Sequence, residues 1–348
     1  MDCRKILIMW FIKHFFLFLA FSLLSVKCSA DSLGPSLIDN NTDISREIIN
    51  PGQGAYDHNL NKFSSYIVVF GDLQTYTMGR YIDYYKHSCN WIRKQYDEGI
   101  NINCILQVGD VTQNNTDSQW SLFKQVSDTI GSVIPYFVCL GNHDYSWSSS
   151  KIFNRSYTKI NNYAHFPLTD EKIICYFKEG DLSNYIARLD NKDNFSLIAL
   201  EFGPRKEVVN WAVDYVKGHP EQLFILMTHE WLNSEGQRIY LGSSAEQQLK
   251  GYSSYSTPEE VWNQLVWPND NILCVLCGHA GFNARLFSEN CKGRQVPQIL
   301  FNLQYVVNGG NGLIQIWELP ENSNTIIVRI YDTFKQNWYK SEKTTFSF

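Results

Sequence analysis

The sequence has no excess of basic residues, since its 30 Lys and Arg are outnumbered by 35 Asp and Glu, for a formal net charge of −5. A chain with this balance lacks the cations that neutralise phosphates along a nucleic acid, so we expect no nucleic-acid-binding surface. Only 19% of the residues are charged, whereas 44% are hydrophobic and 15% aromatic. This composition excludes an intrinsically disordered chain.

A disulfide framework is also missing. Of the nine cysteines, Cys3 and Cys28 lie in the N-terminal segment described below, and the other seven are an odd number spread over a long chain. Cys274 and Cys277 lie in an apolar run that predicts a buried strand, where side chains three positions apart point to opposite faces. We therefore interpret these cysteines as small core residues, and not as a redox pair or as zinc ligands.

Two common catalytic motifs are absent. The chain contains neither a Gly-rich P-loop nor a Gly-x-Ser-x-Gly nucleophile elbow, which leaves a P-loop nucleotidase and a serine hydrolase unsupported. Beyond residue 30 there is no run of 18 consecutive apolar residues, so we expect no transmembrane segment in the mature protein. Nothing in the sequence specifies an oligomeric state.

Residues 1–30 have the pattern of a secretory signal peptide. Arg4 and Lys5 form a basic start, an apolar run follows, and small residues precede a suitable cleavage point. We therefore expect a cleaved leader and a secreted or extracytoplasmic protein. The alternative is an uncleaved N-terminal anchor that tethers the protein to a membrane, because residues 6–26 are long enough to span one. Lys13 interrupts that run and favours cleavage.

The rest of the chain predicts a polar lead-in followed by one domain. Residues 31–64 lack sustained periodicity and predict a linker or poorly ordered segment, and residues 65–348 predict a single domain. Apolar runs predict strands at 66–71, 103–108, 135–140, 173–178, 184–189, 195–200, 223–227 and 272–277. Apolar residues at helical spacing predict helices at 81–96, 118–130 and 205–217, and a fourth helix that begins at Thr257. This alternation predicts an α/β layered fold. Residues 145–170 predict a long surface loop, and 284–348 predict further strands.

Five of the predicted strands end in polar residues that can bind a metal, namely Asp72, Asp110, Asn142-His143-Asp144, His229 and His279. Ligands of open α/β sheets gather at the carboxyl ends of the strands, so we expect these side chains to converge. Carboxylate, amide carbonyl and imidazole together suit divalent Mn, Fe, Zn or Ni. Two adjacent ions of this kind would activate a water and clamp the oxygens of an in-line phosphoryl displacement.

In this order and context, the motifs resemble the calcineurin-like metallophosphoesterase superfamily. They are Gly71-Asp72-Leu73-Gln74, Gly109-Asp110, Gly141-Asn142-His143-Asp144, Thr228-His229 and Gly278-His279, and Gly-Asn-His-Asp is the most specific of them. The resemblance covers about residues 64–332. It implies a four-layer αββα sandwich of two mixed β-sheets flanked by helices, and a secreted metal-dependent hydrolase of phosphoric monoesters or diesters.

The resemblance also implies roles for individual residues. Asp110 would bridge two divalent metal ions, and Asp72 would bind the first. The second ion would be held, together with Asp110, by Asn142, His229 and His279. His143, aimed by Asp144, would stabilise or protonate the leaving oxygen. The alternative is a catalytically silent metal-binding or interaction module on the same scaffold, although such a module has no need of His143.

The departures from the family pattern fall on the first ion. Gln74 stands where the usual motif has a histidine, and Gly281 replaces the last histidine of Gly-His-x-His. Gln74 still offers a carbonyl oxygen, a harder and weaker ligand than imidazole, while water, Asn283 or nothing would take the other place. We therefore expect a weaker first site. Gln113 stands where purple acid phosphatases carry a tyrosine, which counts against that branch.

Other runs, at 200–205, 228–233 and 302–304, resemble a subgroup of secreted members that carry the same glutamine and lack the last histidine. The departures are therefore interpreted as a subgroup design. The residues that recognise the substrate are not predicted. Arg155, Arg205 and Arg285 are candidates for a contact with phosphate, with a solvated surface position as the competing interpretation.

Overall fold

The computed structural model describes residues 60–147, 153–189, 195–239, 255–281 and 283–347. The predicted signal peptide of residues 1–30 and most of the predicted lead-in of residues 31–64 lie outside the described residues. The chain divides into two units, Met1–Gly52 and Gln53–Phe348. All that follows concerns the second unit.

The first of two mixed β-sheets contains six strands: β1 (Ser65–Phe70), β2 (Asn101–Gln107), β3 (Tyr136–Val138), β13 (Leu313–Leu319), β14 (Thr325–Asp332) and β15 (Asn337–Ser347). Their order is β15-β14-β13-β1-β2-β3. β1, β2 and β3 are parallel to one another, whereas β13 pairs with β1 and with β14 in antiparallel fashion. The carboxyl ends of β1, β2 and β3 therefore lie at the same edge of this sheet.

The second sheet contains seven strands: β6 (Ile173–Tyr176), β7 (Tyr185–Arg188), β8 (Phe195–Leu200), β9 (Leu223–Thr228), β10 (Ile272–Cys277), β11 (Asn283–Glu289) and β12 (Gln295–Phe301). Their order is β11-β12-β10-β9-β8-β7-β6, with β8, β9, β10 and β12 parallel. Their carboxyl ends meet at one edge too. β9 and β10 are buried along their whole lengths apart from the first residue of β9, as expected of strands that are covered on both faces.

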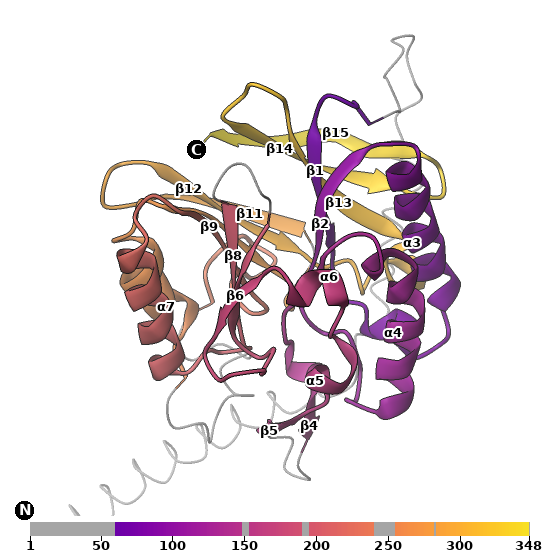
Figure 1. The fold of residues 1–348 in the computed structure, drawn as a ribbon, viewed down its shortest axis with the longest axis horizontal. Helices are drawn as coiled ribbons and strands as arrows, with labels where there is room; N and C mark the ends of the chain where they lie inside the picture. The colour runs from indigo at the N-terminus through magenta and orange to yellow at the C-terminus, as the bar shows by residue number, and fades with distance from the viewer. Residues whose placement is uncertain (1–59, 148–152, 190–194, 240–254, 282, 348) are drawn as a thin grey trace, which may run out of the picture. The chain divides into compact units, whose positions relative to one another are not determined.

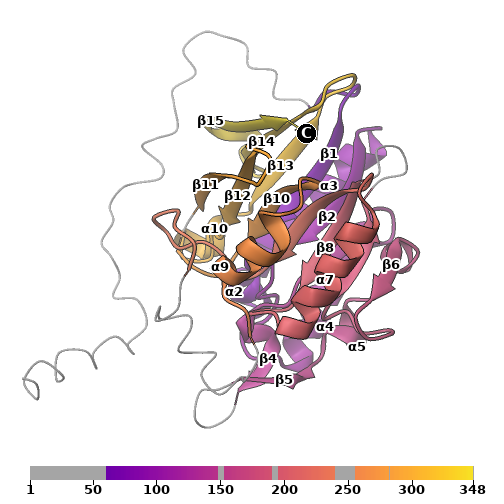
Figure 2. The same ribbon diagram turned by 90° about the vertical axis from the view of Figure 1, so that its left-hand side faces the viewer.

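Helices cover the outer faces of both sheets (Figures 1 and 2). α3 (Ile82–Asp97) and α4 (Asp117–Gly131) lie beside the first sheet, where the ring of Tyr85 packs edge-on against Phe70 at 5.2 Å. α7 (Lys206–Gly218), α9 (Pro258–Val261) and the π-helical η2 (Trp262–Val266) cover the second, where Val208 and Leu265 share a buried cluster with Phe224. The predicted αββα sandwich is confirmed.

The start of α9 shows how local sequence fixes an element. The Thr257 side chain accepts a hydrogen bond from the backbone N–H of Glu260 at 3.2 Å, and the Glu260 carboxylate accepts one from the backbone N–H of Thr257 at 2.8 Å. Pro258 occupies the first turn, where the missing N–H costs nothing. The predicted helix start at Thr257 is confirmed, as are the other predicted strands and helices to within a few residues.

The prediction of a long surface loop at residues 145–170 is wrong. The described part of this segment forms β4 (Tyr145–Trp147), β5 (Phe153–Thr158), α5 (Ile160–Tyr163) and α6 (Pro167–Asp170). Phe166 is fully buried and packs against Tyr136 of β3, with ring centroids 5.4 Å apart. Phe166, one of the aromatic residues that suggested an open surface, therefore covers the edge strand of the first sheet.

The interpretation of the cysteines is confirmed for the described part of the chain. None of its seven cysteines forms a disulfide, and five of them are buried: Cys89, Cys104, Cys139, Cys274 and Cys277. Across the same residues, no helix has the length and apolar character that a membrane crossing requires.

Candidate metal centre

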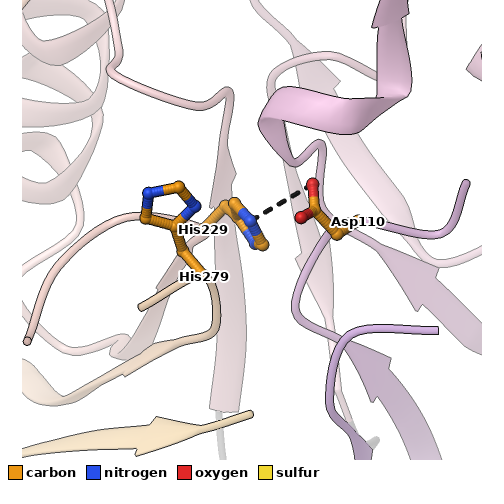
Figure 3. Close-up of side chains that lie close together, drawn as sticks. All are labelled: Asp110, His229 and His279. Carbon is orange, nitrogen blue, oxygen red and sulfur yellow. Dashed lines mark ion pairs between the residues drawn. The ribbon is translucent and has the colours of Figure 1, made fainter. Parts of the chain in front are cut away.

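Side chains from both sheets meet where the parallel strands end (Figure 3). Asp110 follows β2, His229 follows β9 and His279 follows β10, and one ligand atom of each lies within 4.8 Å of the others. Oδ1 of Asp110 is 3.3 Å from Nε2 of His229. Oδ1 of Asn142, which follows β3, is 2.9 Å from Nδ1 of His279. The four residues predicted to hold the second ion are therefore brought together.

One ring nitrogen of His229 faces this group. Its Nδ1–H donates a hydrogen bond of 2.7 Å to the backbone carbonyl of Val108, so Nε2 is the nitrogen that points at the other side chains. Nε2 is buried, and Oδ1 of Asp110 lies 3.3 Å from it. Once Nε2 has lost its proton, it offers a buried lone pair that a bound cation would take up. The donor set of two imidazoles, a carboxylate and an amide oxygen fits a divalent metal ion.

The charges at the centre favour a cation. Burial raises the pKa of Asp110, but the imidazoles of His229 and His143 outweigh it and hold that pKa well below its usual range. Burial lowers the pKa of His229, yet the Asp110 and Asp72 carboxylates raise it to about 10. Burial and the nearby His229 lower the pKa of His279 to about 3. A metal ion would compete with a proton for Asp110 and His229.

Two of the predicted ligands have unusual backbone conformations. Asp110 has φ 51° and His279 has φ 72°, which is the left-handed region that non-glycine residues seldom adopt. Such conformations cost roughly 1–3 kcal/mol each and persist only where the surroundings hold them. The carbonyl of Asp110 accepts a hydrogen bond of 3.0 Å from the backbone N–H of Leu73, and that of His279 accepts one of 2.8 Å from the Asn302 side chain.

Two glycines of the predicted motifs are required by close approach to a ligand. A Cβ atom added at Gly141 would lie 2.1 Å from Oδ1 of Asp110, and one added at Gly278 would lie 2.4 Å from Oδ1 of Asp72. Any side chain at either position would displace the carboxylate. The glycine that opens each motif therefore belongs to the architecture of the centre.

The residues predicted for the first ion offer only oxygen atoms. Asp72 is buried, and burial, to which Asp110 adds, raises its pKa well above the usual range. Gln74, at the start of α2 (Gln74–Thr77), is also buried, and its Oε1 atom has no hydrogen-bond partner. Gly281 has φ 73°, and a Cβ atom there would lie 2.5 Å from Cβ of Ser234. Position 281, where the resemblance leads us to expect a histidine, therefore has no room for a side chain. Asn283 lies in β11, and its buried Oδ1 also has no hydrogen-bond partner.

Asn302 and Gln304 are site residues whose role the sequence reasoning missed. Nε2 of Gln304 donates a hydrogen bond of 2.9 Å to Oδ2 of Asp72, and its backbone N–H donates one of 3.0 Å to Oδ1 of Asn302. Asn302 in turn holds the carbonyl of His279. The run at 302–304 had been noted only as a subgroup resemblance. Because it follows β12, which is parallel to β10, the rule of strand ends would have placed it here.

The role of Asp144 in aiming the ring of His143 stays a prediction, and the structure shows what else its carboxylate contacts. The Asp144 carboxylate accepts hydrogen bonds from the backbone N–H groups of Thr112, Gly141 and Val111 at 2.8, 3.0 and 3.2 Å. The carboxylate therefore links the loop after β2 to the loop after β3. Asp144 is the last residue of the short turn Asn142–Asp144, and in this position its side chain points at the backbone. Burial and Asp110 raise the pKa of Asp144 to about 7, against the lowering effect of these hydrogen bonds.

Gln113 contacts the ring of His143. Nδ1 of His143 lies 2.9 Å from the backbone carbonyl oxygen of Gln113, to which it donates. The backbone N–H of His143 donates a hydrogen bond of 2.9 Å to Oδ1 of Asp110. Gln113 therefore holds the ring of His143, whereas the Asp110 carboxylate holds its backbone.

Two of the candidate arginines support the protein near the centre. Arg155 lies 3.0 Å from the carboxylate of the buried Glu201, and Arg205 lies 2.8 Å from it. Arg155 also donates to the backbone carbonyl of Phe202, whose ring packs against His279 at 5.2 Å. Both guanidinium groups therefore hold the segment around Glu201 and Phe202, which lies beside His279. Arg285, the third candidate, lies in β11.

The chain is similar to known proteins. The model of the family described as calcineurin-like phosphoesterase matches residues 65–281, more than half of the chain. The uncharacterized protein YvnB of Bacillus subtilis is 25% identical over 280 residues, which are 75% of this chain and 20% of that protein. Probable inactive purple acid phosphatase 27 of Arabidopsis thaliana is 32% identical over 91 residues, which are 25% of this chain and 15% of that one. The chain thus spans about a fifth or less of the length of these relatives. Among solved structures, the calcineurin-like phosphoesterase YfkN from Bacillus subtilis aligns with a TM-score of 0.38 and 12% identity, over 82% of this chain and 90% of that chain.

Proposed function

The chain belongs to the calcineurin-like phosphoesterase family, and from that premise we propose that it hydrolyses phosphoric monoesters or diesters with the help of two divalent metal ions. The observation that carries the proposal is the cluster of Asp110, His229 and His279, with Asn142 beside it and Nε2 of His229 buried and facing Asp110. When bound, the ions would lower the pKa of a water and hold the phosphate oxygens during in-line attack.

The two ions would be held with different strength. Asp110, Asn142, His229 and His279 offer two nitrogen and two oxygen atoms, a set that suits Mn, Fe, Zn or Ni and would hold the tighter ion. The weaker ion would share Asp110 and take Asp72 and the unpaired Oε1 of Gln74, all of which are oxygen ligands. Gly281 supports this difference in affinity, because a side chain that could add a further ligand to the weaker ion does not fit at that position.

His143 would assist departure of the leaving group. Its Nδ1–H is engaged by the Gln113 carbonyl, so the proton that it delivers to the leaving oxygen would be carried on Nε2. Its backbone N–H donates to Asp110, the carboxylate that both ions would share, and so holds the backbone of His143 beside the centre. A proton on Nε2 would thus be placed for transfer to the leaving oxygen of a phosphate that the metal ions hold.

The test is an activity panel with metals. Purified mature protein is stripped of metal, supplied in turn with Mn²⁺, Fe²⁺, Zn²⁺ and Ni²⁺, and assayed with p-nitrophenyl phosphate, bis-p-nitrophenyl phosphate and nucleotides. We expect hydrolysis that depends on metal, and the ratio of the first two rates assigns monoesterase or diesterase activity. An absence of turnover with every metal and substrate contradicts the proposal.

A second candidate is a catalytically silent module that binds metal. It is favoured by the weakened first site and by the name of the plant relative, which describes that protein as probably inactive. The two candidates differ in one respect: the silent module would bind one equivalent of metal tightly and hydrolyse none of the substrates. The same panel, read together with metal content, decides between them.

We propose in addition that the protein is secreted after cleavage of residues 1–30. Expression of the full chain in a secreting host, followed by N-terminal sequencing of the product in the medium, tests this. A first residue near Asp31 supports secretion. Recovery of the intact N-terminus in the membrane fraction would instead support the anchored alternative.

A further inference from the structure

The backbone and ring of His279 are held by neighbouring side chains. The Asn302 side chain donates a hydrogen bond of 2.8 Å to the backbone carbonyl of His279, whose backbone N–H donates one of 3.3 Å to Oδ1 of Asp72. The ring of Phe202 packs against the imidazole, with centroids 5.2 Å apart. These contacts fix the backbone and one face of the ring, but they leave open which ring nitrogen carries the proton.

The two ring nitrogens of His279 have different neighbours. Nδ1 lies 2.9 Å from Oδ1 of Asn142, which belongs to the same predicted set of ligands. Nε2 lies 4.0 Å from Oε1 of Glu230. Figure 3 shows one ring nitrogen of His279 turned toward His229 and the other turned away from it. An ion shared with Asn142 would therefore be bound by Nδ1, and Nε2 would face the Glu230 carboxylate.

Glu230 is buried in a segment that is well held on both sides. Only 4% of the residue is exposed, and it directly follows His229 after the end of β9. The backbone carbonyl of His229 accepts a hydrogen bond of 3.0 Å from the backbone N–H of Gly278, which joins the ends of β9 and β10. On the other side, Nε1 of the buried Trp231 donates one of 2.9 Å to Oε1 of Gln298. The carboxylate is therefore kept beside the imidazole.

Binding of an ion by Nδ1 of His279 requires the ring proton to be on Nε2. A neutral imidazole carries one proton, and the nitrogen that binds a metal ion must have none. The side chain of His279 is only 12% exposed, so a proton on Nε2 needs an acceptor within the protein. Glu230 is such an acceptor, because a shift of about 1 Å would shorten the separation to about 2.8 Å, the length of a charge-assisted hydrogen bond.

We propose that Glu230 is a positioning residue for the tighter metal ion. Its carboxylate accepts a hydrogen bond from Nε2–H of His279 and so selects the tautomer and the ring orientation in which Nδ1 binds the ion. The inference rests on the proposed function for the presence of that ion, but not on hydrolysis. Metal-bound histidines usually donate their second N–H to such a partner, and its loss lowers metal affinity roughly 10- to 100-fold.

The tautomer of His279 tests the proposal in the wild-type protein. Protein with isotopically labelled histidine is loaded with Zn²⁺, and proton–nitrogen NMR spectra show which ring nitrogen carries the proton. The signals of His279 are identified by their absence from the spectrum of His279→Gln. We expect a proton on Nε2 and the ion on Nδ1. The reverse assignment would overturn the proposal without the need for any variant of Glu230.

Variants of Glu230 measure its effect on metal affinity. In calorimetric titrations of the metal-free protein with Zn²⁺, Glu230→Ala should weaken the tighter ion roughly 10- to 100-fold. Glu230→Gln, whose amide carbonyl still accepts a hydrogen bond, should lose less. Glu235→Ala, which changes an exposed residue of the same segment, is the matched control and should bind as the wild type does.

The possible outcomes separate this inference from the proposed function. Unchanged affinity in Glu230→Ala, or equal losses in Glu230→Ala and Glu230→Gln, would contradict the positioning role. A merely structural role would lower the free energy of unfolding of the metal-free protein, measured with urea, and leave the affinity unchanged. A wild-type protein that binds no ion would overturn both proposals, whereas one that binds Zn²⁺ as described and hydrolyses nothing would contradict the proposed function alone.

Discussion

The side-chain amide of Gln304 donates a hydrogen bond of 2.9 Å to the carboxylate of Asp72, although the two residues are 232 positions apart in the sequence. Both side chains are buried, so the bond is shielded from water. It fixes one oxygen of a carboxylate that would ligate the weaker metal ion. A hydrogen bond of this kind orients a ligand, and its loss usually affects the ion that depends on that ligand.

Replacement of Gln304 by methionine should weaken the first ion selectively. Methionine has a similar size but no donor, so Asp72 would lose its orientation, and we expect a 10- to 100-fold loss of affinity for that ion. The second ion, which does not use Asp72, should change by no more than about twofold. Calorimetric titration with Mn²⁺ measures the affinities of the two ions separately. The control is Gln295→Met, which changes an exposed residue at the start of β12. Equal weakening of both ions contradicts the orienting role.

Replacement of Asn142 by alanine should remove the tightly bound ion. The side chain supplies one oxygen and also contacts Nδ1 of His279 at 2.9 Å, so two ligands are disturbed at once. After dialysis, metal analysis of the wild type should give at least one equivalent per chain, and the variant should retain little. The exposed Asn263→Ala is the matched control. A variant that binds as much metal as the wild type would rule out the assigned second site.

Replacement of His143 by alanine should separate catalysis from metal binding. The backbone N–H that bonds to Asp110 remains in the variant, so the metal content should be unchanged. Loss of the general acid should lower kcat by about 10²- to 10⁴-fold. The steady-state rate with p-nitrophenyl phosphate and the metal content are measured on the same preparation. Equal turnover by variant and wild type would refute the catalytic role.

Replacement of Asp144 by alanine should act mainly on stability. Three buried backbone N–H groups, those of Val111, Thr112 and Gly141, would lose their acceptor. Each unpaired group costs about 1–3 kcal/mol, so we expect the free energy of unfolding to fall by roughly 3 kcal/mol or more. Urea denaturation measures the difference, and His143→Ala, which removes no such acceptor, is the comparison. If the two variants were equally stable, Asp144 would not be the fastener of these loops.

The sequence predicted those parts of the fold and site that depend on short stretches of chain. Apolar runs before Asp72, Asp110 and His279 predicted strands, and the common edge of parallel strands predicted that the ligands meet. The segment around Phe166 was misjudged because its burial depends on Tyr136, which no local pattern reveals. The same holds for Gln304, whose partner is remote in sequence.

The orientation of a carboxylate was equally beyond the sequence. Asp144 follows a histidine in a family motif, and the resemblance to that family implies that it holds the ring. Its position at the end of a turn instead directs the oxygens at backbone N–H groups of Thr112 and Gly141. Motif spacing identified the residue as important, whereas only the turn geometry identified what it touches.

The family's two missing histidines should respond differently to restoration. At position 74 the wild-type side chain is buried with an unpaired Oε1 atom, so Gln74→His places a stronger nitrogen ligand where a weak oxygen ligand stood. We expect the first Zn²⁺ site to gain at least tenfold in affinity. At position 281 the backbone has φ 73° and a Cβ atom would lie 2.5 Å from Ser234, so Gly281→His should strain the loop without a gain. Calorimetry with Zn²⁺ on both variants compares them. If Gly281→His strengthened the first site and Gln74→His did not, Gln74 would lie outside the metal centre.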